Sequence, residues 1–387
     1  QETQLSVNPL GGHNYWLASD ILKNTYKCER VGIYSPYDYL IGGGEYYLSM
    51  LIKFLIKCGA KHVHFYNHSG EKMFKNTLMR FFTPAEISII KKCHIHDIVD
   101  NHTYDYFIEM GNQQYPRLTK RKISKTFIYH CQFPFDHYDP KINIQQMNNV
   151  DYIILNSDYT QKYYKKKLHN KDYHKLIVNY PACFKKQLPN KKIKEPNTFV
   201  MIGRIHEPNM GAHNKCHSDI IKIFRKLISH NIPFKLYIIG TIQNVKYYNY
   251  LKSLEIKDHI IIIGDCLEEK KHEIIDKCQY HIHATGINLK EQNRCFSFEH
   301  FGISTIECIN RGCIPICING GFFPFYIKHL KNGFLYNTTD ELTHILEKIL
   351  KSKIPHHQFE EINKINKNII EKFSESAFFD RLTEMLL

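Results

Sequence analysis

The chain has 387 residues, 43% of them hydrophobic and 23% charged, which favours two domains with a core each over a single domain. This composition excludes a single small binding module as well as disordered and collagen-like chains. Lys and Arg number 52 against 38 Asp and Glu, and the formal charge of +14 indicates an anionic partner: nucleic acid, membrane phosphate or a small phosphorylated ligand.

The sequence carries no signal for a membrane span or for secretion. No window approaches the ~18 apolar residues that cross a bilayer, and the first twenty residues lack a basic start before an apolar run. The twelve cysteines stand singly, without a C-x-x-C pair, which predicts free thiols in a reducing compartment. We expect a soluble or membrane-peripheral cytoplasmic protein. The chain opens on Gln, so we also expect it to belong to a longer polypeptide.

Short apolar runs alternate with helical patterns, which predicts parallel sheets covered by helices. In the first half, one helix is predicted over 46–57 and another over 159–168, where Ser157 and Asp158 are good N-caps. The predicted strands of this half are 31–35, 62–66, 106–109, 126–129, 152–155 and 176–179.

A polar, basic segment with two prolines, 185–197, indicates a linker, and a second series of elements follows it. The tail from about 365 to 387 is predicted to be an amphipathic helix pair. We therefore predict an α/β fold with two doubly wound domains in tandem. The second series consists of strands 199–202, 234–239, 260–263, 280–283 and 314–318, with helices 218–230, 247–254, 268–278 and 303–310.

Ligands of open parallel sheets bind beyond the carboxyl ends of the strands, so these ends hold the candidate site residues. Gly203, Gly240 and Gly264 each close a strand, where the chain needs positive φ or close backbone approach. Arg204 follows Gly203, and Lys215 stands just before a helix. A guanidinium and an ammonium at one strand end suit a diphosphate, and the alternative is two ordinary surface charges.

The segment EHFGISTIE places two carboxylates around a predicted helix start. Gly302 interrupts the chain, Ile303 begins the helix, and Gly312 ends it. Glu299 then lies in the preceding loop and Glu307 one turn into the helix, whose first N–H groups can hold an anion. The alternative is that Glu307 only complements the helix dipole and Glu299 is a solvated loop residue.

Two further kinds of strand-end feature are weaker candidates. Three glycines, Gly42–Gly44, lie between the first strand and the first long helix, where backbone amides can approach a phosphate or a sugar. His130 and His283 each end a predicted strand. The alternatives are a plain turn for the glycines and a surface or core position for the histidines.

Together these motifs resemble the retaining, sugar-nucleotide-dependent glycosyltransferases of family 4, which have the GT-B fold. The resemblance covers about 31–350. It rests on the Gly-rich loop, on Gly-Arg with a later Lys, and on the E-x7-E motif of 299–307. DYIILNSDYT, NYP at 179–181, HNK at 213–215 and KNGFLYNTTDEL match the family as well.

The resemblance implies two Rossmann-like domains that face a central cleft. We place the N-terminal domain, on the acceptor side, at 1–190, and the donor-binding domain at 191–365. The resemblance also implies that the terminal helix 366–387 crosses back to the N-terminal domain.

The resemblance further implies roles for individual residues. Arg204 and Lys215 would bind the donor diphosphate, Glu307 the ribose hydroxyls and Glu299 the donor sugar, while His130 would face that sugar. The remaining donor-binding residues are Gly43 and Gly44, approaching the phosphates from the other domain, and Gly203, His283, Phe301, Gly302 and Ile303, the last three through their backbone amides.

The implied activity is that of a hexosyltransferase in glycan biosynthesis, acting with retention of configuration. The donor would be a nucleoside-diphosphate sugar with UDP or GDP, and the acceptor a glycan, lipid-linked or protein-linked hydroxyl. The chain has no D-x-D pair, so we expect no metal and no cofactor. One departure is the apolar run FFPFY after Gly320–Gly321, where the family commonly has an acid. That departure concerns the acceptor or sugar edge of the pocket.

Two alternatives remain at this point. One is a basic α/β scaffold that binds nucleic acid or another anion without catalysis, although the chain has no aromatic-basic platform and we expect no nucleic acid. The other is a sugar-nucleotide epimerase of the same fold.

Overall fold

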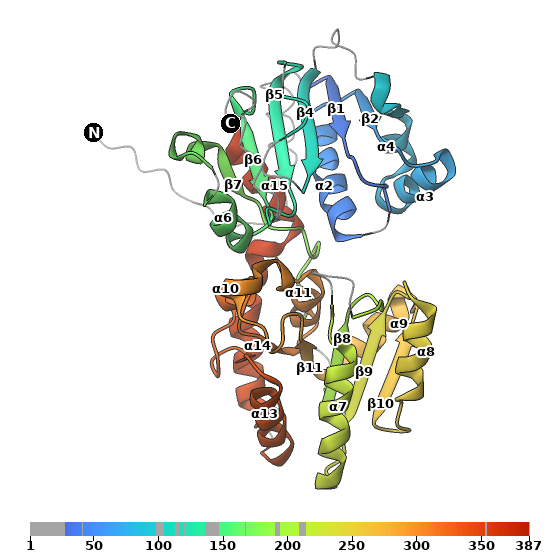
Figure 1. The fold of residues 1–387 in the computed structure, drawn as a ribbon, viewed down its shortest axis with the longest axis vertical. Helices are drawn as coiled ribbons and strands as arrows, with labels where there is room; N and C mark the ends of the chain where they lie inside the picture. Colours follow the sequence, from blue (N-terminus) through green and yellow to red (C-terminus); the bar gives the residue numbers. More distant parts are fainter. Residues whose placement is uncertain are drawn as a thin grey trace, which may run out of the picture. The chain divides into compact units, whose positions relative to one another are not determined.

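The computed structural model describes residues 28–40, 42–97, 104–112, 116–119, 121–135, 147–166, 168–189, 194–208, 214–352 and 354–386. It divides into two compact units (Figure 1). The first unit comprises Gln1–Ile154 and Leu168–Ile177, and the second comprises Leu155–Lys167 and Val178–Leu387. The sequence placed the boundary near residue 190, so the structure differs from that division.

The physical reason lies in the predicted linker, which packs on the second unit. The Gln187 side chain donates to the Lys367 carbonyl, and the Leu188 N–H donates to the Asn310 side chain. Lys194 donates from Nζ to the carbonyls of Ile275 and Arg311. The described part of the predicted linker is thus anchored on the second unit, and its last three residues, 195–197, belong to β8.

The first unit is built on a sheet with the strand order β3-β2-β1-β4-β5-β6-β7, in which β1 pairs in parallel with both β2 and β4. Its buried residues include Val31, Ile33, Phe65 and Phe107, all fully enclosed. The elements are β1 (Arg30–Tyr34), α2 (Gly43–Lys57), β2 (His62–Tyr66), α3 (Glu71–Phe81), α4 (Pro84–Ser88), β3 (Ile90–Cys93), β4 (Tyr104–Gly111), β5 (Ser124–Cys131), β6 (Tyr152–Leu155) and β7 (Leu176–Val178).

The second unit is built on a sheet with the order β10-β9-β8-β11-β12-β13, and its strand pairs are parallel. The prediction of two doubly wound domains is confirmed. The elements are α6 (Asp158–Lys165), β8 (Glu195–Ile202), α7 (His217–Leu227), β9 (Lys235–Gly240), α8 (Val245–Ser253), β10 (Ile260–Gly264), α9 (Glu268–Lys277), β11 (Cys278–His283), α10 (Glu291–Arg294), α11 (Ile303–Asn310), β12 (Ile314–Ile318), α12 (Phe323–Tyr326), β13 (Phe334–Tyr336), α13 (Thr339–Lys351), α14 (His356–Ile370) and α15 (Glu375–Leu386).

The glycines that close β8 and β9 are required by close approach and not by positive φ. A Cβ on Gly240 would lie 1.9 Å from the carbonyl oxygen of Gly203, which no side-chain movement relieves. Neither glycine has a positive φ. Gly240 therefore lets the end of β9 lie against the Gly203 backbone, and Gly203 leaves room for the Lys215 side chain.

The terminal helices pack on the segment that follows β7. The Cys183 N–H donates to the Phe373 carbonyl at 2.8 Å, and the Glu375 N–H donates to the Phe184 carbonyl at 2.9 Å. Arg381 Nε donates to the Asn179 side chain at 2.7 Å. The amphipathic pair predicted for the tail is confirmed, and these partners belong to the same unit. Among the described residues no helix is long and apolar enough to span a membrane.

A buried carboxyl group anchors a loop of the first unit. Glu109 in β4 is 2% exposed and accepts hydrogen bonds from the backbone N–H groups of Arg117 and Leu118. Burial raises its pKa from 4.5 to about 7, and the two backbone donors oppose that rise only in part.

This shift predicts a pH-dependent stability. Between about pH 4.5 and pH 7 the unfolded chain releases a proton that the folded chain keeps, so the free energy of unfolding falls as the pH rises, by on the order of 3 kcal/mol. Glu109→Gln should remove this decrease in the free energy of unfolding. Glu71→Gln, at an exposed position, should show the same decrease as the wild type. Urea unfolding of the three proteins at about pH 5 and about pH 8 checks this. Parallel pH profiles for wild type and Glu109→Gln would contradict it.

Candidate functional site

Lys215 reaches the carboxyl end of the second sheet across a glycine. Its side-chain stem packs on Gly203, the residue after β8, where an added Cβ would lie 2.9 Å from Lys215 Cγ. Lys215 directly precedes Cys216, the N-cap of α7, whose φ of 57° turns the chain into the helix. Gly203 is thus needed for the Lys215 side chain to lie across the strand end.

The Lys215 ammonium meets Glu299, which in turn contacts a histidine at the end of β11. Lys215 Nζ lies 2.7 Å from Glu299 Oε2, and His283 Nε2 lies 3.0 Å from the same oxygen. Because a carboxylate oxygen only accepts, both nitrogens donate to it. Oε1 of Glu299 has no hydrogen bond to a described residue. The structure therefore brings together three side chains that the sequence proposed from separate places: Lys215 before a helix, Glu299 in the loop before another helix, and His283 at a strand end.

The electrostatics of this cluster keep Glu299 ionised. Burial by itself would raise the pKa of the carboxyl, but the Lys215 charge and the His283 hydrogen bond hold it well below its usual range. His283 is 3% exposed, and burial lowers its pKa although Glu299 opposes the change. The cluster is therefore an ion pair with a neutral imidazole, whose Nδ1 has no partner among the described atoms.

A tight turn after β12 closes over the backbone of Glu299. The Phe322 N–H donates to the Glu299 carbonyl at 3.0 Å. Gly321 has a φ of 63°, and a Cβ there would lie 2.2 Å from the same carbonyl oxygen. The Phe323 ring packs on the His283 ring with centroids 4.7 Å apart. Gly321 is thus required both by its backbone conformation and by this close contact.

Helix α11 begins beside Glu299, as the sequence predicted. Gly302 is its N-cap with a φ of 88°, and Ile303 is its first residue. The first N–H groups of a helix have no acceptor within it, so those of Ile303 and Ser304 can bind an anion. The Phe301 side chain is buried against Phe322 and Phe373, which leaves only its backbone to face a ligand.

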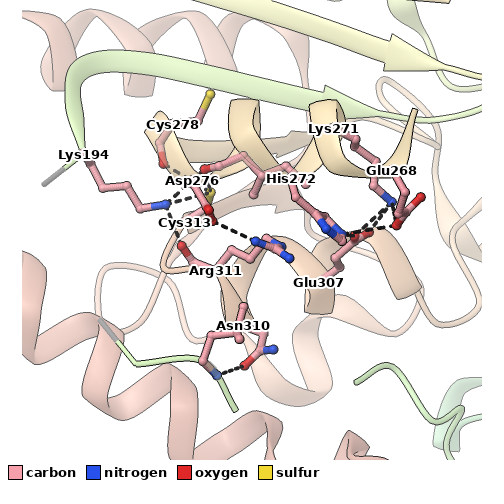
Figure 2. Close-up of polar contacts among 12 residues, drawn as sticks. Lys194, Glu268, Lys271, His272, Asp276, Cys278, Glu307, Asn310, Arg311 and Cys313 are labelled. Atoms are coloured by element: carbon pink, nitrogen blue, oxygen red, sulfur yellow. Dashed lines mark hydrogen bonds and ion pairs between the residues drawn. The ribbon is translucent and has the colours of Figure 1, made fainter. Parts of the chain in front are cut away.

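The second carboxylate of the motif, Glu307, lies among cationic and basic side chains of α9 (Figure 2). Its Oε1 lies 2.9 Å from Lys271 Nζ and 2.9 Å from His272 Nε2, and its Oε2 lies 3.2 Å from Lys271 Nζ. Lys271 Nζ also contacts Glu268 Oε1 at 2.7 Å. Burial alone would lower the pKa of Lys271, but the two carboxylates outweigh it and raise the pKa.

Within the described residues, Glu268, His272 and Glu307 are the one group with the spacing of metal ligands, their ligand atoms lying within 4.8 Å of one another. The Lys271 ammonium already contacts both carboxylates. A divalent cation would have to displace this charge, so the cluster fits a lysine better than a metal. That the protein needs no metal remains a prediction.

The other predicted site residues lie as follows. Arg204 is exposed just beyond β8 and forms no ion pair with a described residue. In the first unit, Gly43 and Gly44 open α2, and a Cβ on Gly44 would lie 2.2 Å from the Gln132 side chain. His130 is 1% exposed, stacks on Tyr47 and contacts the Ile154 carbonyl through Nδ1. Burial lowers its pKa to about 4.

Sequence reasoning missed Lys271 and His272. They lie in EEKKHE, a charged run that is typical of a solvated helix face. The available signal was weak: α9 follows the strand end at Gly264, and such helices begin near the ligand edge of a parallel sheet.

Solved structures with a similar arrangement define the class of fold. A glycosyltransferase from Rickettsia africae is 15% identical with a TM-score of 0.67, covering 93% of this chain and 98% of that one. Anabaena HepE, solved in complex with UDP, is 14% identical with a TM-score of 0.63, covering 92% and 99%. With its two parallel-sheet domains, the chain has the GT-B fold of glycosyltransferases.

The sequence comparisons match parts of this chain to glycosyltransferases. The family model of the glycosyl transferases group 1 matches residues 184–366, which contain Lys215, Glu299 and Glu307. The GDP-Man:Man(3)GlcNAc(2)-PP-Dol alpha-1,2-mannosyltransferase of Dictyostelium discoideum is 26% identical over 139 residues, 36% of this chain and 25% of that protein. The chain thus spans about a quarter of the length of the curated relative it matches. Fold and family match together support a glycosyltransferase.

Proposed function

We propose that the chain is a hexosyltransferase that moves a sugar from a nucleoside-diphosphate sugar to an acceptor hydroxyl, with retention of configuration and without a metal. The observation that carries the proposal is the Lys215–Glu299–His283 cluster beside the start of α11. It places an ammonium, a carboxylate and free helix N–H groups at the carboxyl edge of the second sheet. A diphosphate linked to a sugar needs groups of these kinds.

The proposed division of labour follows from the hydrogen-bonding capacity of each group. Lys215 Nζ carries three N–H donors and gives one to Glu299, so two remain for phosphate oxygens. Glu299 uses Oε2 for Lys215 and His283, which leaves Oε1 for a hydroxyl of the donor sugar. The exposed Arg204 beside Gly203 would add a planar pair of donors for the diphosphate.

These groups would act on the charge that develops as the sugar leaves. The bond between the anomeric carbon and the diphosphate oxygen breaks, and negative charge accumulates on that oxygen. Lys215, Arg204 and the α11 N–H groups are in place before the reaction, so they stabilise this charge without reorganisation. Cationic side chains thus take the role that a divalent metal would otherwise have.

Retention follows in the proposal from attack on the same face of the sugar. The acceptor oxygen bonds to the anomeric carbon on the side from which the diphosphate departs, and its proton passes to the leaving phosphate oxygen. Glu299 is better suited to bind the sugar than to act as a nucleophile, because Lys215 and His283 already occupy its Oε2.

The comparisons suggest, for the proposal, which donors and acceptors to test. HepE was solved with UDP, and the Dictyostelium relative is described as using GDP-mannose on a dolichol diphosphate-linked glycan. We therefore propose a UDP or GDP sugar as donor and a glycan or glycoconjugate as acceptor. No observation favours the epimerase or the nucleic-acid scaffold.

The proposal is tested by thermal shift against UDP, GDP and ADP, their sugars and a DNA oligonucleotide, because a ligand of the folded state raises its apparent stability. We expect stabilisation by one nucleotide family, followed by sugar transfer that persists in EDTA and gives a product with the anomeric configuration of the donor. Stabilisation by DNA alone, or conversion of the sugar nucleotide to its epimer, would contradict the proposal. Loss of transfer in EDTA with recovery in Mn²⁺ would refute metal independence.

Arg204→Ala and Lys215→Ala should each lower the transfer rate by ~10²–10³, the usual cost of removing one preorganised donor to a developing oxyanion. Lys222→Ala is the matched control, because this lysine lies on α7 with its side chain 65% exposed. Steady-state kinetics with melting curves for each variant separates catalysis from folding. Transfer near the wild-type rate in both variants would refute the diphosphate site.

The two carboxylates should differ in what they bind. Glu307→Gln should weaken both the free nucleoside diphosphate and the intact donor by about 1.5–3 kcal/mol, because both ligands carry the ribose. Glu299→Gln should weaken the intact donor and leave the free diphosphate nearly unchanged. Calorimetric titration of both variants measures this, with Glu273→Gln on the exposed side of α9 as control. Equal weakening of the free diphosphate by both would contradict the assignment.

A further inference from the structure

Glu307 does not lie free in its pocket. Its Oε1 accepts from His272 and lies 2.9 Å from the Lys271 ammonium, whereas its Oε2 accepts from Lys271 at 3.2 Å and from no other described residue. His272 Nε2 lies between Glu307 Oε1 and Glu268 Oε1, two oxygens that only accept, so it is the protonated nitrogen. Two nitrogens thus lie against Oε1 and one lies against Oε2, so Oε2 is the less crowded oxygen and has acceptor capacity left.

Helices α9 and α11, which carry these residues, are also joined by polar contacts one helical turn further on. Arg311 of the α11 C-terminus donates to Asp276 of α9 at 2.9 Å, and Lys194 Nζ donates to the carbonyls of Ile275 and Arg311 (Figure 2). Asp276 follows His272 by four residues and Arg311 follows Glu307 by four, so both ties lie on the same helix faces. With two ties, α9 cannot shift along α11 without breaking ion pairs, and its side chains keep their positions relative to Glu307.

We propose that Lys271 and His272 are positioning residues that fix Glu307 so that Oε2 accepts one ribose hydroxyl of the donor nucleotide. The inference rests on the proposed function and names the specificity it adds: preference for a ribonucleotide over its deoxy form. A site built to hydrogen-bond a hydroxyl disfavours a ligand without it, because the partly buried acceptor then loses that hydrogen bond and keeps only its contact with Lys271. This discrimination requires that the Glu307 carboxylate stay in place when the hydroxyl is missing. Lys271 and His272 hold it there and prevent it from turning to solvent.

The charge balance of the cluster agrees with a positioning role. Lys271 is 17% exposed and bridges Glu307 and Glu268, so its ammonium is held by two carboxylates rather than presented to a ligand. His272 is also directed to carboxylates. Both side chains therefore act on the nucleotide through Glu307.

The experiment compares affinities for GDP and UDP with those for their 2′-deoxy and 3′-deoxy forms, by calorimetry. In the wild type, one deoxy form should bind about tenfold or more weakly than the ribonucleotide. In Lys271→Met and His272→Ala this penalty should shrink to about threefold or less, through weaker binding of the ribonucleotide and nearly unchanged binding of the deoxy form. His272→Gln, which keeps a donor at the position of Nε2, should recover most of the penalty.

Lys270→Met is the matched control. Its lysine is the neighbour of Lys271 on α9, but it is 60% exposed and pairs with Glu273. Lys270→Met should keep the full affinity penalty for the deoxy nucleotide. If it reduces this penalty as much as Lys271→Met does, the inference is overturned, because loss of one positive charge would then explain both results.

Three other results would also overturn it. The first is that Lys271→Met and His272→Ala keep the wild-type affinity penalty for the deoxy nucleotide. The second is that both variants bind the ribonucleotide and its deoxy forms more weakly by the same factor. The third is that either variant binds the ribonucleotide more tightly than the wild type does. The proposed function is tested separately: a wild type that transfers sugar without a deoxy penalty refutes only this inference. A wild type that binds neither diphosphate and transfers no sugar refutes the proposed function as well.

Discussion

The organisation of the second unit depends on one carboxylate, that of Glu299, and on the atoms that reach it. Lys215 arrives from the chain after β8, and His283 from the end of β11. The turn after β12 contacts the backbone of the same residue through the Phe322 N–H. Three neighbouring strand ends are therefore joined at one residue. Since an ionised group this little exposed is costly without partners, the Lys215 and His283 contacts offset the cost of burying the Glu299 carboxylate.

The eight-residue spacing of the two glutamates gives them different surroundings. Glu299 precedes the left-handed Gly302, so it belongs to the loop and faces Lys215 and His283. Glu307 lies in the second turn of α11 and faces α9, where Lys271 and His272 reach it. Each carboxylate thus has one lysine and one histidine, yet they come from different elements. The motif thus places one carboxylate just before α11 and a second carboxylate in its second turn. In the proposed function, this arrangement suits a ligand with hydroxyls on either side of a diphosphate.

Much of the fold could be predicted, because buried parallel strands are nearly continuous apolar runs and their ends are marked by glycine. The bounds of α11 were predicted correctly since Gly302 and Gly312 delimit it. The strand β3 was missed because it is an edge strand, IKKC, whose solvent-facing positions carry lysines. At an edge, one side of the strand has no neighbour, so the apolar signal that marks a central strand is absent.

The candidate site could be predicted in part. Lys215 and His283, which follow β8 and end β11, both contact Glu299 of the loop before α11, because parallel strands bring their carboxyl ends to one edge. Position at a strand end did not reveal that His130 is buried against Tyr47, since burial depends on what packs over that end. The contacts of Lys271 and His272 with Glu307 join residues 36 and 35 positions apart. They depend on how α9 packs on α11, which local patterns do not encode.

The apolar run after Gly320–Gly321 lies beside a carboxylate that comes from another part of the sequence. The glycine pair is followed directly by Phe322 and Phe323, which are fully buried, and not by an acidic residue. Glu291 of α10 supplies one instead: its Oε2 accepts from the Gly321 N–H at 3.1 Å, and its Oε1 is held by Lys162 and Tyr163 of α6. A carboxylate therefore stands at the glycine turn although it comes from a segment 30 residues earlier. Phe323 in turn packs on His283, the ring that donates to Glu299.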